Sequence, residues 1–262
     1  MFHYSKAILR VGGRILATYF FQIKKWAKHI EKYPRELRFS KMRNLCRHIT
    51  NALSIDLQVF GLENVPHDET FYLVCNHMSA FDPLAFISIL DKPIAFVGKK
   101  ELLKAPFVPK ALEVLESETI DRDDLRQSLE VMLRIEDSLK RREKNWMIFP
   151  EGTRIRDQLL PVASFHHGTF RPAVKSKTII LPAAIYGTFR VFSKKPQFKK
   201  YPVFVSFLKP MTPEEYQGLS TSDIAQIMQE TIQREITYHL RPLDHKLMSE
   251  SKDKKYRYTQ VL

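Results

Sequence analysis

Apolar and polar residues change their spacing near residue 54, and this change divides the chain into two parts. From Ser5 to Lys28 the apolar residues recur at helical spacing and share one half of a helical wheel. They are Ile8, Leu9, Val11, Ile15, Leu16, Tyr19, Phe20, Ile23 and Trp26. Only Phe21 breaks the pattern. A second helix is predicted after the Tyr33-Pro34 break, with an apolar stripe of Phe39, Met42, Leu45, Ile49 and Leu53.

Beyond residue 54 short apolar segments alternate with helical ones, a pattern typical of α/β domains. The predicted strands cover residues 54–60, 70–76, 93–99, 145–150, 178–187 and 203–211. The predicted helices cover residues 82–90, 123–142 and 222–240. The helix over 123–142 is the clearest, and Asp123 is its expected cap. We expect its core stripe to be Leu125, Leu129, Met132, Leu133 and Leu139.

These elements predict an α/β fold with a mixed central sheet flanked by helices. We expect a single domain over residues 54–245, preceded by two amphipathic helices over residues 1–53. A polar basic tail follows over residues 246–262. The strand over 70–76 has apolar residues on both faces, so we expect it in the centre of the sheet.

The positive charge is concentrated in the predicted N-terminal helices. The chain has 262 residues and a net charge of +13. Twelve Lys and Arg residues against two Glu residues place +10 of that charge in residues 1–50. On the first helix the basic residues face away from the apolar half, as in helices that lie in a membrane interface. Each basic residue near an anionic surface adds about 1 kcal/mol. We therefore expect binding to an anionic membrane surface; the alternative is a helical hairpin on the domain with a solvated basic face.

Other sequence features narrow the expected location. Arg10 and Arg14 interrupt the apolar residues that a secretory signal would need. The chain has no run of roughly 18–20 apolar residues, the length that a conventional transmembrane helix requires. Its two cysteines, Cys46 and Cys75, imply no disulfide framework and favour a reducing compartment. We expect a peripheral, monotopic protein on the cytoplasmic face of the membrane.

A histidine and a carboxylate lie where the strand over 70–76 gives way to the next helix. His77 is suited to general-base chemistry, and Asp82 can accept a ring N–H and fix the imidazole tautomer if the helix folds back. The chain has no G-x-S-x-G nucleophile motif, and Cys75 is expected to be buried and inert. A hydroxyl activated by His77 is therefore expected to arrive with the substrate. The alternative for Asp82 is a helix cap alone.

A second polar loop, Phe149-Pro150-Glu151-Gly152-Thr153-Arg154, follows another predicted strand. Glu151 can order the loop or accept a hydrogen bond from a substrate hydroxyl, and Gly152 permits a tight turn. Arg154 offers a planar set of donors suited to phosphate. Further basic residues follow neighbouring strands: Lys99, Lys100 and Arg122. Each of these residues also has a purely structural alternative. Arg154 could pair with Glu151 in a solvated turn, and Lys99 and Lys100 could be ordinary surface charges. Arg122 could form a local ion pair with Asp121 or Asp123.

These two loops resemble the signature blocks of the glycerolipid acyltransferase family. The blocks are Asn76-His77 with Asp82 (the HxxxxD motif) and residues 149–154 (the FPEGTR motif), in the family's order and separation. The closest resemblance is to the 1-acyl-sn-glycerol-3-phosphate acyltransferases of the bacterial PlsC type. The segments "FVGKKELLKAPFV" and "ETIDRDD" between the loops, and Leu181-Pro182 after them, also fit. The resemblance covers roughly residues 55–210.

The resemblance implies an enzyme that acylates lysophosphatidic acid to phosphatidic acid. His77 would deprotonate the acceptor hydroxyl, Asp82 would orient His77, and Asn76 would support the loop. Substrate binding would fall to Lys99, Arg122, Glu151, Gly152, Thr153 and Arg154. The family implies no metal and no bound cofactor, because the acyl thioester, on acyl-CoA or acyl carrier protein, is a co-substrate.

One segment departs from the family pattern. Relatives commonly carry a basic Phe-Lys-Lys-Gly-like run after the FPEGTR motif, whereas this chain has Phe165-His166-His167-Gly168. A metal site formed by these histidines with His77, Asp82 and Glu151 is disfavoured. Adjacent side chains in an extended chain point apart, and no tetrahedral ligand spacing occurs. We interpret the two histidines as loop residues that keep part of the lysine role.

Two other functions remain open from the sequence. The same fold could acylate glycerol-3-phosphate or another lysophospholipid, because only the acceptor pocket would differ. A nucleic-acid-binding protein is suggested by charge alone, but its aromatic residues would lie among the basic ones to stack on bases. Here they line the opposite helical face, so we expect no nucleic-acid partner. The acyl donor, the preferred chain length and the oligomeric state do not follow from the sequence.

Overall fold

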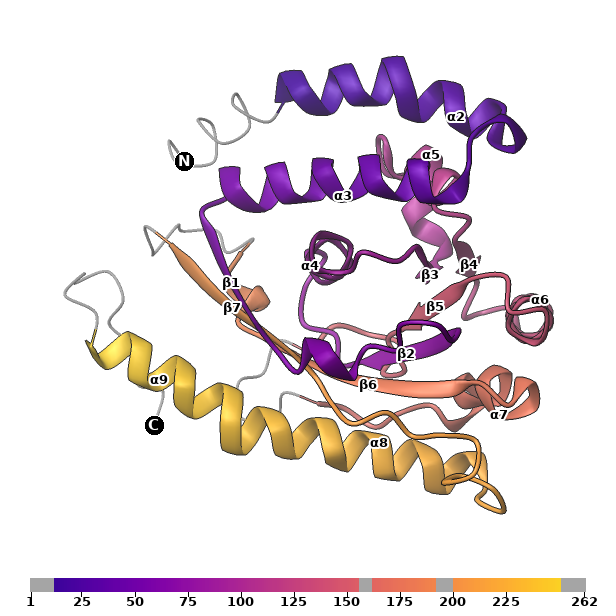
Figure 1. Ribbon diagram of the computed structural model, residues 1–262, viewed down its shortest axis with the longest axis vertical. Coiled ribbons are helices and arrows are strands. Elements are labelled where there is room, and N and C mark those ends of the chain that lie inside the picture. Colours follow the sequence, from indigo (N-terminus) through magenta and orange to yellow (C-terminus); the bar gives the residue numbers. More distant parts are fainter. Residues whose placement is uncertain (1–11, 156–161, 192–199, 251–262) are drawn as a thin grey trace.

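A computed structural model describes residues 12–155, 162–191 and 200–250. Within these ranges seven strands form one sheet in the order β1-β7-β6-β2-β5-β3-β4 (Figure 1), and the mixed central sheet that the sequence predicted is confirmed. The strands are β1 Ile55–Phe60, β2 Phe71–Cys75, β3 Ile94–Lys99, β4 Glu118–Ile120, β5 Asn145–Ile148, β6 Ile179–Tyr186 and β7 Tyr201–Phe207. Strands β6, β2, β5, β3 and β4 are mutually parallel, and β7 is antiparallel to β6.

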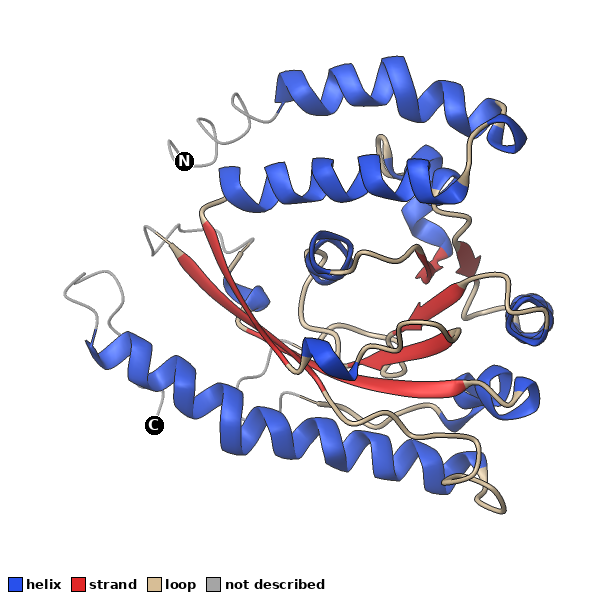
Figure 2. Ribbon diagram, in the orientation of Figure 1, coloured by secondary structure: helices blue, strands red, loops and turns tan. Residues whose placement is uncertain are grey.

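Helices cover both faces of the sheet (Figure 2). They are α2 Lys24–Lys28, α3 Arg35–Ala52, α4 Asp82–Ile89, α5 Val108–Val114, α6 Leu125–Lys140, α7 Arg171–Ser176, α8 Thr221–Glu235 and α9 Arg241–Glu250. Shorter helical turns are η1 Tyr19–Ile23, η2 Ile30–Lys32, η3 Leu62–Asn64, η4 Lys100–Lys104, η5 His167–Phe170, η6 Thr188–Arg190 and η7 Ile236–Leu240. One core cluster joins the sheet to α3, α4 and α5, and a second joins it to α6, α7 and α8.

Strand β2 shows why the sheet is buried on both sides. Phe71, Leu73 and Cys75 belong to the first core cluster, whereas Tyr72 and Val74 belong to the second. All five side chains are fully buried. The near-continuous apolar run of this segment follows from that double burial, since successive strand residues point to opposite faces.

The N-terminal helix and α3 pack on the first face of the sheet. The described part of the N-terminal helix comprises residues 12–18, the π-helical turn η1 and α2. Its Ile23 and Trp26 are buried, and so are Phe39, Met42 and Leu45 of α3, as the predicted stripes require. The helix predicted from Ser5 to Lys28 also included Lys6, Ile8, Leu9, Arg10 and Val11, which lie outside the described residues. None of the helices in the part of the chain that the structure describes is long and apolar enough to cross a membrane.

The predicted core stripe of α6 was wrong for three of its five residues. Leu125, Leu129 and Leu133 are exposed, Met132 is half-buried, and Leu139 is buried. The buried face instead consists of Val131, Ile135, Glu136, Ser138 and Leu139. Polar residues are tolerated there because they have partners: the Trp146 indole donates to Ser138 at 3.2 Å, and Lys140 Nζ donates to Glu136 at 2.6 Å.

Two helix boundaries also differ from the prediction. Asp124, not Asp123, caps α6, because its carboxylate is the one that accepts the backbone N–H of Gln127 at 3.0 Å. The final helix does not end at residue 240 but continues through η7 into α9, which reaches Glu250. The helix therefore crosses the boundary that was expected between the domain over residues 54–245 and the tail over residues 246–262. The sequence also missed α5 and α7, which are seven and six residues long.

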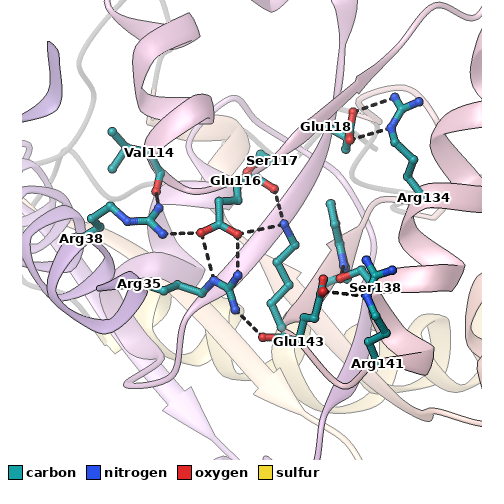
Figure 3. A network of polar contacts seen from close by, with 12 residues as sticks. Arg35, Arg38, Val114, Glu116, Ser117, Glu118, Arg134, Ser138, Arg141 and Glu143 are labelled. Carbon is teal, nitrogen blue, oxygen red and sulfur yellow. Dashed lines mark hydrogen bonds and ion pairs between the residues drawn. The ribbon is translucent and has the colours of Figure 1, made fainter. Parts of the chain in front are cut away.

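A cluster of charges fixes α3 to the amino-terminal edge of the parallel strands (Figure 3). Glu116, in the turn between α5 and β4, accepts hydrogen bonds from Arg35 at 2.6 and 3.1 Å and a further one from Arg38. Lys144, just before β5, donates to the same carboxylate at 3.2 Å. Burial alone would raise the pKa of Glu116, but these cationic donors outweigh it and lower the pKa to about 2.

We expect Glu116→Gln to lower the free energy of unfolding by about 3 kcal/mol at neutral pH. The folded-state pKa lies below the ordinary 4.5, so this contribution is present above pH 4.5 and is lost as the pH falls toward 2. Urea unfolding of both proteins across this pH range checks the size and the direction of the effect.

Glu118→Gln is the matched control for this experiment. Glu118 pairs with Arg134 at 2.9 Å on the surface, where such pairs contribute about 0–1 kcal/mol (Figure 3). Equal losses in the two variants at neutral pH would contradict a special role for Glu116.

Candidate active site

The connections after β2 and β5 diverge at the carboxyl edge of the sheet. These strands are adjacent and parallel. The chain leaves β2 for α4 on one face of the sheet, whereas it leaves β5 for α7 on the other. Neighbouring strands whose connections diverge in this way leave a gap at the carboxyl edge, where ligands of open α/β sheets bind. His77 follows β2 and Glu151 follows β5, so both face this edge.

His77 and Asp82 are in direct contact, as the sequence predicted. The Nδ1 atom of His77 lies 2.7 Å from Oδ2 of Asp82, which also accepts the backbone N–H groups of Met78 at 2.7 Å and Ser79 at 2.8 Å. Asp82 is fully buried, whereas 15% of the His77 side chain is exposed. Asp82 thus orders the loop and holds Nδ1 as the protonated ring nitrogen, which leaves Nε2 of His77 available as a base.

Phe149 holds the imidazole from the other side, a role that the sequence reasoning missed. Its ring stacks on that of His77, with centroids 4.1 Å apart and planes inclined by 21°. The backbone N–H of Ile155 also donates to the carbonyl of His77 at 2.7 Å, so the loops after β2 and β5 are tied together. The sequence feature that could have indicated this role is the position of Phe149, which is the first residue of the FPEGTR motif and lies at the end of a strand.

Glu151 is buried beside this pair. Its Oε1 accepts the backbone N–H of His77 at 3.1 Å, and its buried Oε2 has no partner among the described residues. Burial raises the pKa of Glu151 to about 8; the Asp82 charge adds to the rise, and the backbone N–H groups of His77 and Ala163 oppose it. Glu151 is therefore largely protonated at neutral pH.

Gly152 lies in a turn that brings Arg122 and His166 together. Its φ is +66°, a conformation that side chains disfavour. A methyl group on Gly152 would also lie 3.3 Å from the His166 imidazole and 3.8 Å from the guanidinium carbon of Arg122. The structure therefore places Arg122 against the FPEGTR loop. The alternative, a local ion pair of Arg122 with Asp121 or Asp123, is not formed. Asp121 binds Lys100 instead, and Arg122 has no ion pair with any described residue.

The remaining predicted residues differ in how closely they join the site. Asn76 is buried and extends the β2–β6 ladder: its amide donates to the carbonyl of Ile185 at 2.9 Å and accepts that residue's N–H at 2.8 Å. Arg154 is half-buried and forms no ion pair with Glu151 or any other described residue, and Thr153 is exposed. Lys99 ends β3, which β5 separates from β2, and its Nζ lies 4.0 Å from Glu101.

Among the described residues, the candidate site offers a histidine suited to act as a base but no nucleophile in contact with it. Burial raises the pKa of Cys75 well above its ordinary value, and the charges of Asp82 and Glu151 raise it further. No hydroxyl or thiol of the described residues hydrogen-bonds to the His77 ring. In the described ranges no three His, Cys, Asp or Glu side chains are grouped as metal ligands would be. The arrangement can take a proton from a hydroxyl that a substrate brings.

Comparison with solved structures finds a similar fold over most of the chain. It is the crystal structure of the 1-acyl-sn-glycerophosphate acyltransferase PlsC from Thermotoga maritima. The TM-score is 0.67 at 25% sequence identity, over 89% of this chain and 91% of that one.

Sequence comparison gives relatives from bacteria and eukaryotes, each named a 1-acyl-sn-glycerol-3-phosphate acyltransferase. The protein from Borreliella burgdorferi is 33% identical over 60% of this chain, and that from Saccharomyces cerevisiae is 26% identical over 62%. The chain spans 62% and 54% of their respective lengths. The family model described as Acyltransferase matches residues 56–186, half of the chain and the part that holds both motifs. This protein therefore belongs to the acyltransferase family.

Proposed function

We propose that this protein transfers an acyl chain from an acyl thioester to the free hydroxyl of lysophosphatidic acid, which gives phosphatidic acid. The observation that carries the proposal is the His77–Asp82 pair at the carboxyl edge of β2, where no hydroxyl or thiol of the described residues hydrogen-bonds to the His77 ring. Such a pair acts on a hydroxyl supplied by the acceptor. The names of the relatives support this acceptor.

In the proposed reaction Nε2 of His77 removes the hydroxyl proton as the acceptor oxygen attacks the thioester carbonyl carbon. The new C–O ester bond forms, the C–S bond breaks, and the imidazolium returns its proton to the departing thiolate. Asp82 stabilises the imidazolium through its contact with Nδ1 at 2.7 Å. The proton is conserved, and no acyl-enzyme is needed.

A protonated Glu151 fits this mechanism. A neutral Glu151 places no second negative charge beside Asp82. Asp82 can then orient His77, while the neutral carboxyl of Glu151 is free to act as a hydrogen-bond donor. Its neutral Oε2–H can donate to a substrate oxygen, because Oε2 has no partner among the described residues.

Basic residues near the site support an acceptor with a phosphate group. Arg122 and Arg154 have no ion-pair partner in the described part of the chain, and an unpaired guanidinium can bind phosphate with two parallel hydrogen bonds. We propose that Lys99 also contributes to binding of the acceptor phosphate. The same residues would hold glycerol-3-phosphate or another lysophospholipid, and the donor would be acyl-CoA or acyl carrier protein.

We further propose that the protein works as a peripheral protein on the cytoplasmic face of an anionic membrane. In this division residues 1–53 provide membrane association, residues 54–245 provide the catalytic domain, and residues 246–262 form a basic tail. The large excess of positive charge in the N-terminal segment supports this division.

His77→Ala and Asp82→Asn are expected to lower acyl transfer on the order of 10²–10⁴-fold, because the general base or its orientation is lost. Free-thiol release with lysophosphatidic acid and either donor, together with identification of the lipid product, measures the effect. His239→Ala is the matched control, since His239 also contacts a carboxylate, Glu235, at 2.6 Å, but outside the site.

Retained activity in His77→Ala would refute the proposed base. Thiol release that does not need the acceptor would indicate a thioesterase instead. If neither donor supports release with lysophosphatidic acid, the other acceptors named above become the candidates.

Glu151→Gln is expected to remove a pH dependence of stability. Unfolded Glu151 loses its proton near pH 4.5, whereas the folded protein keeps it to about pH 8. The folded state binds more protons between these values, so the free energy of unfolding of the wild type falls as the pH rises. Above pH 8 the variant should be more stable than the wild type by on the order of 4 kcal/mol.

Urea unfolding at about pH 5, 7 and 9 checks this prediction. Glu130→Gln, on the exposed face of α6, serves as the control and should follow the wild type. Parallel pH profiles for the wild type and Glu151→Gln would contradict the raised pKa.

A further inference from the structure

The apolar half of the N-terminal helix is wider than its packing requires. Its inward residues are Ile15, Tyr19, Ile23 and Trp26, which contact the first core cluster. Three other apolar residues face outward: Leu16, Phe20 and Phe21 are 45%, 55% and 78% exposed. The π-helical turn η1 contains both phenylalanines. These residues thus form a second apolar face that the described part of the protein does not cover.

A distant segment adds to this face. Leu103, in η4, is 52% exposed, and Phe107, just before α5, is 39% exposed. Phe107 has a φ of 67°, a left-handed conformation that costs a bulky residue about 1–3 kcal/mol. The chain therefore keeps a strained backbone at a large apolar side chain that the core does not bury.

The two segments meet at Tyr19. Its ring packs edge-on against Phe107, with centroids 4.8 Å apart, and against Phe20, with centroids 5.3 Å apart. Figure 1 shows α5 beside the N-terminal helices. We call the exposed set the apolar rim; its residues are Leu16, Phe20, Phe21, Leu103 and Phe107.

Positive charge surrounds the apolar rim. All four charged residues of the stretch 12–28 are basic, namely Arg14, Lys24, Lys25 and Lys28. Lys24 Nζ lies 6.0 Å from the centre of the Phe20 ring. In η4, Lys104 adds a further basic residue, whereas Lys99 and Lys100 lie beside the carboxylates of Glu101 and Asp121. Exposed aromatic and aliphatic side chains with basic neighbours are complementary to the interface of an anionic bilayer.

The apolar rim lies at the edge of the sheet that holds the candidate active site. Segment η4 directly follows the carboxyl end of β3, and β3 is parallel to β2 through β5. His77 follows the carboxyl end of β2 at the same edge. A bilayer at the apolar rim would therefore lie on the side from which a lipid acceptor enters.

We propose that the apolar rim inserts into the interface of an anionic bilayer and that Leu103 and Phe107 form a second insertion element outside the N-terminal helices. The proposal rests on the proposed function for its purpose, since an enzyme acting on lysolipids gains from facing them. Vesicle binding tests the membrane contact of the apolar rim whether or not the proposed function holds.

Sedimentation with vesicles of an equimolar mixture of phosphatidylglycerol and phosphatidylcholine measures the contact. Leu103→Glu and Phe107→Gly should each weaken vesicle binding about tenfold. Phe107→Gly removes the ring and also relaxes the left-handed backbone, so its fold should be preserved. Leu62→Glu is the matched control, because Leu62 is 50% exposed in η3, which follows β1 at the opposite edge.

Phe107→Trp gives a direct readout of insertion, because both native tryptophans are buried. Its fluorescence should be quenched by brominated lipid in these vesicles, and that of Leu62→Trp should not. Equal quenching in the two variants, or vesicle binding unchanged in Leu103→Glu and Phe107→Gly, would overturn the proposal.

Thiol release from a short-chain lysophosphatidic acid dissolved as monomers separates the two proposals. Variants of the apolar rim should keep this activity, whereas an inactive wild type would count against the proposed function alone. Vesicle binding reports on the apolar rim in either case.

Discussion

A buried carboxylate whose charge must be satisfied from within the protein determines the geometry of the site. Asp82 is fully buried, and a charge in that position is costly unless donors surround it. The chain supplies them at Oδ2 by wrapping residues 77–79 around it, whereas Oδ1 has no hydrogen-bond partner among the described residues. Burial, with a smaller contribution from the nearby Asp82 charge, raises the pKa of the second carboxylate, Glu151, to about 8. One carboxylate thus orients the imidazole while its neighbour stays neutral.

The fold explains why these groups meet. The connections leave β2 and β5 for opposite faces of the sheet, and the Asn76 amide prolongs the β2–β6 ladder up to the residue before His77. At the other edge, Glu116 ties α3 to the turns before β4 and β5. Charge therefore holds α3 at the amino-terminal edge, opposite the edge that carries the candidate site.

Local features were predictable from the sequence, and features that depend on distant contacts were not. His77 and Asp82 could be paired because they are close in sequence, and β2 was recognised because both of its faces are apolar. Strand β4 and helices α5 and α7 are too short for a periodic pattern. On α6 two apolar stripes competed, and partners of Ser138 and Glu136 decided which one was buried. The stacking of Phe149 on His77 and the approach of Arg122 to Gly152 require knowledge of the strand order.

The burial of Cys75 has a consequence for the redox chemistry of the proposed reaction. Each turnover would release a thiol beside β2, where an exposed cysteine thiolate could enter thiol–disulfide exchange with that product once it is oxidised. Cys75 directly precedes Asn76, yet it is fully buried and its pKa is raised by burial and by the neighbouring carboxylates. It stays protonated and inaccessible to a mixed disulfide. Burial and a raised pKa thus both disfavour glutathionylation or oxidation at this position.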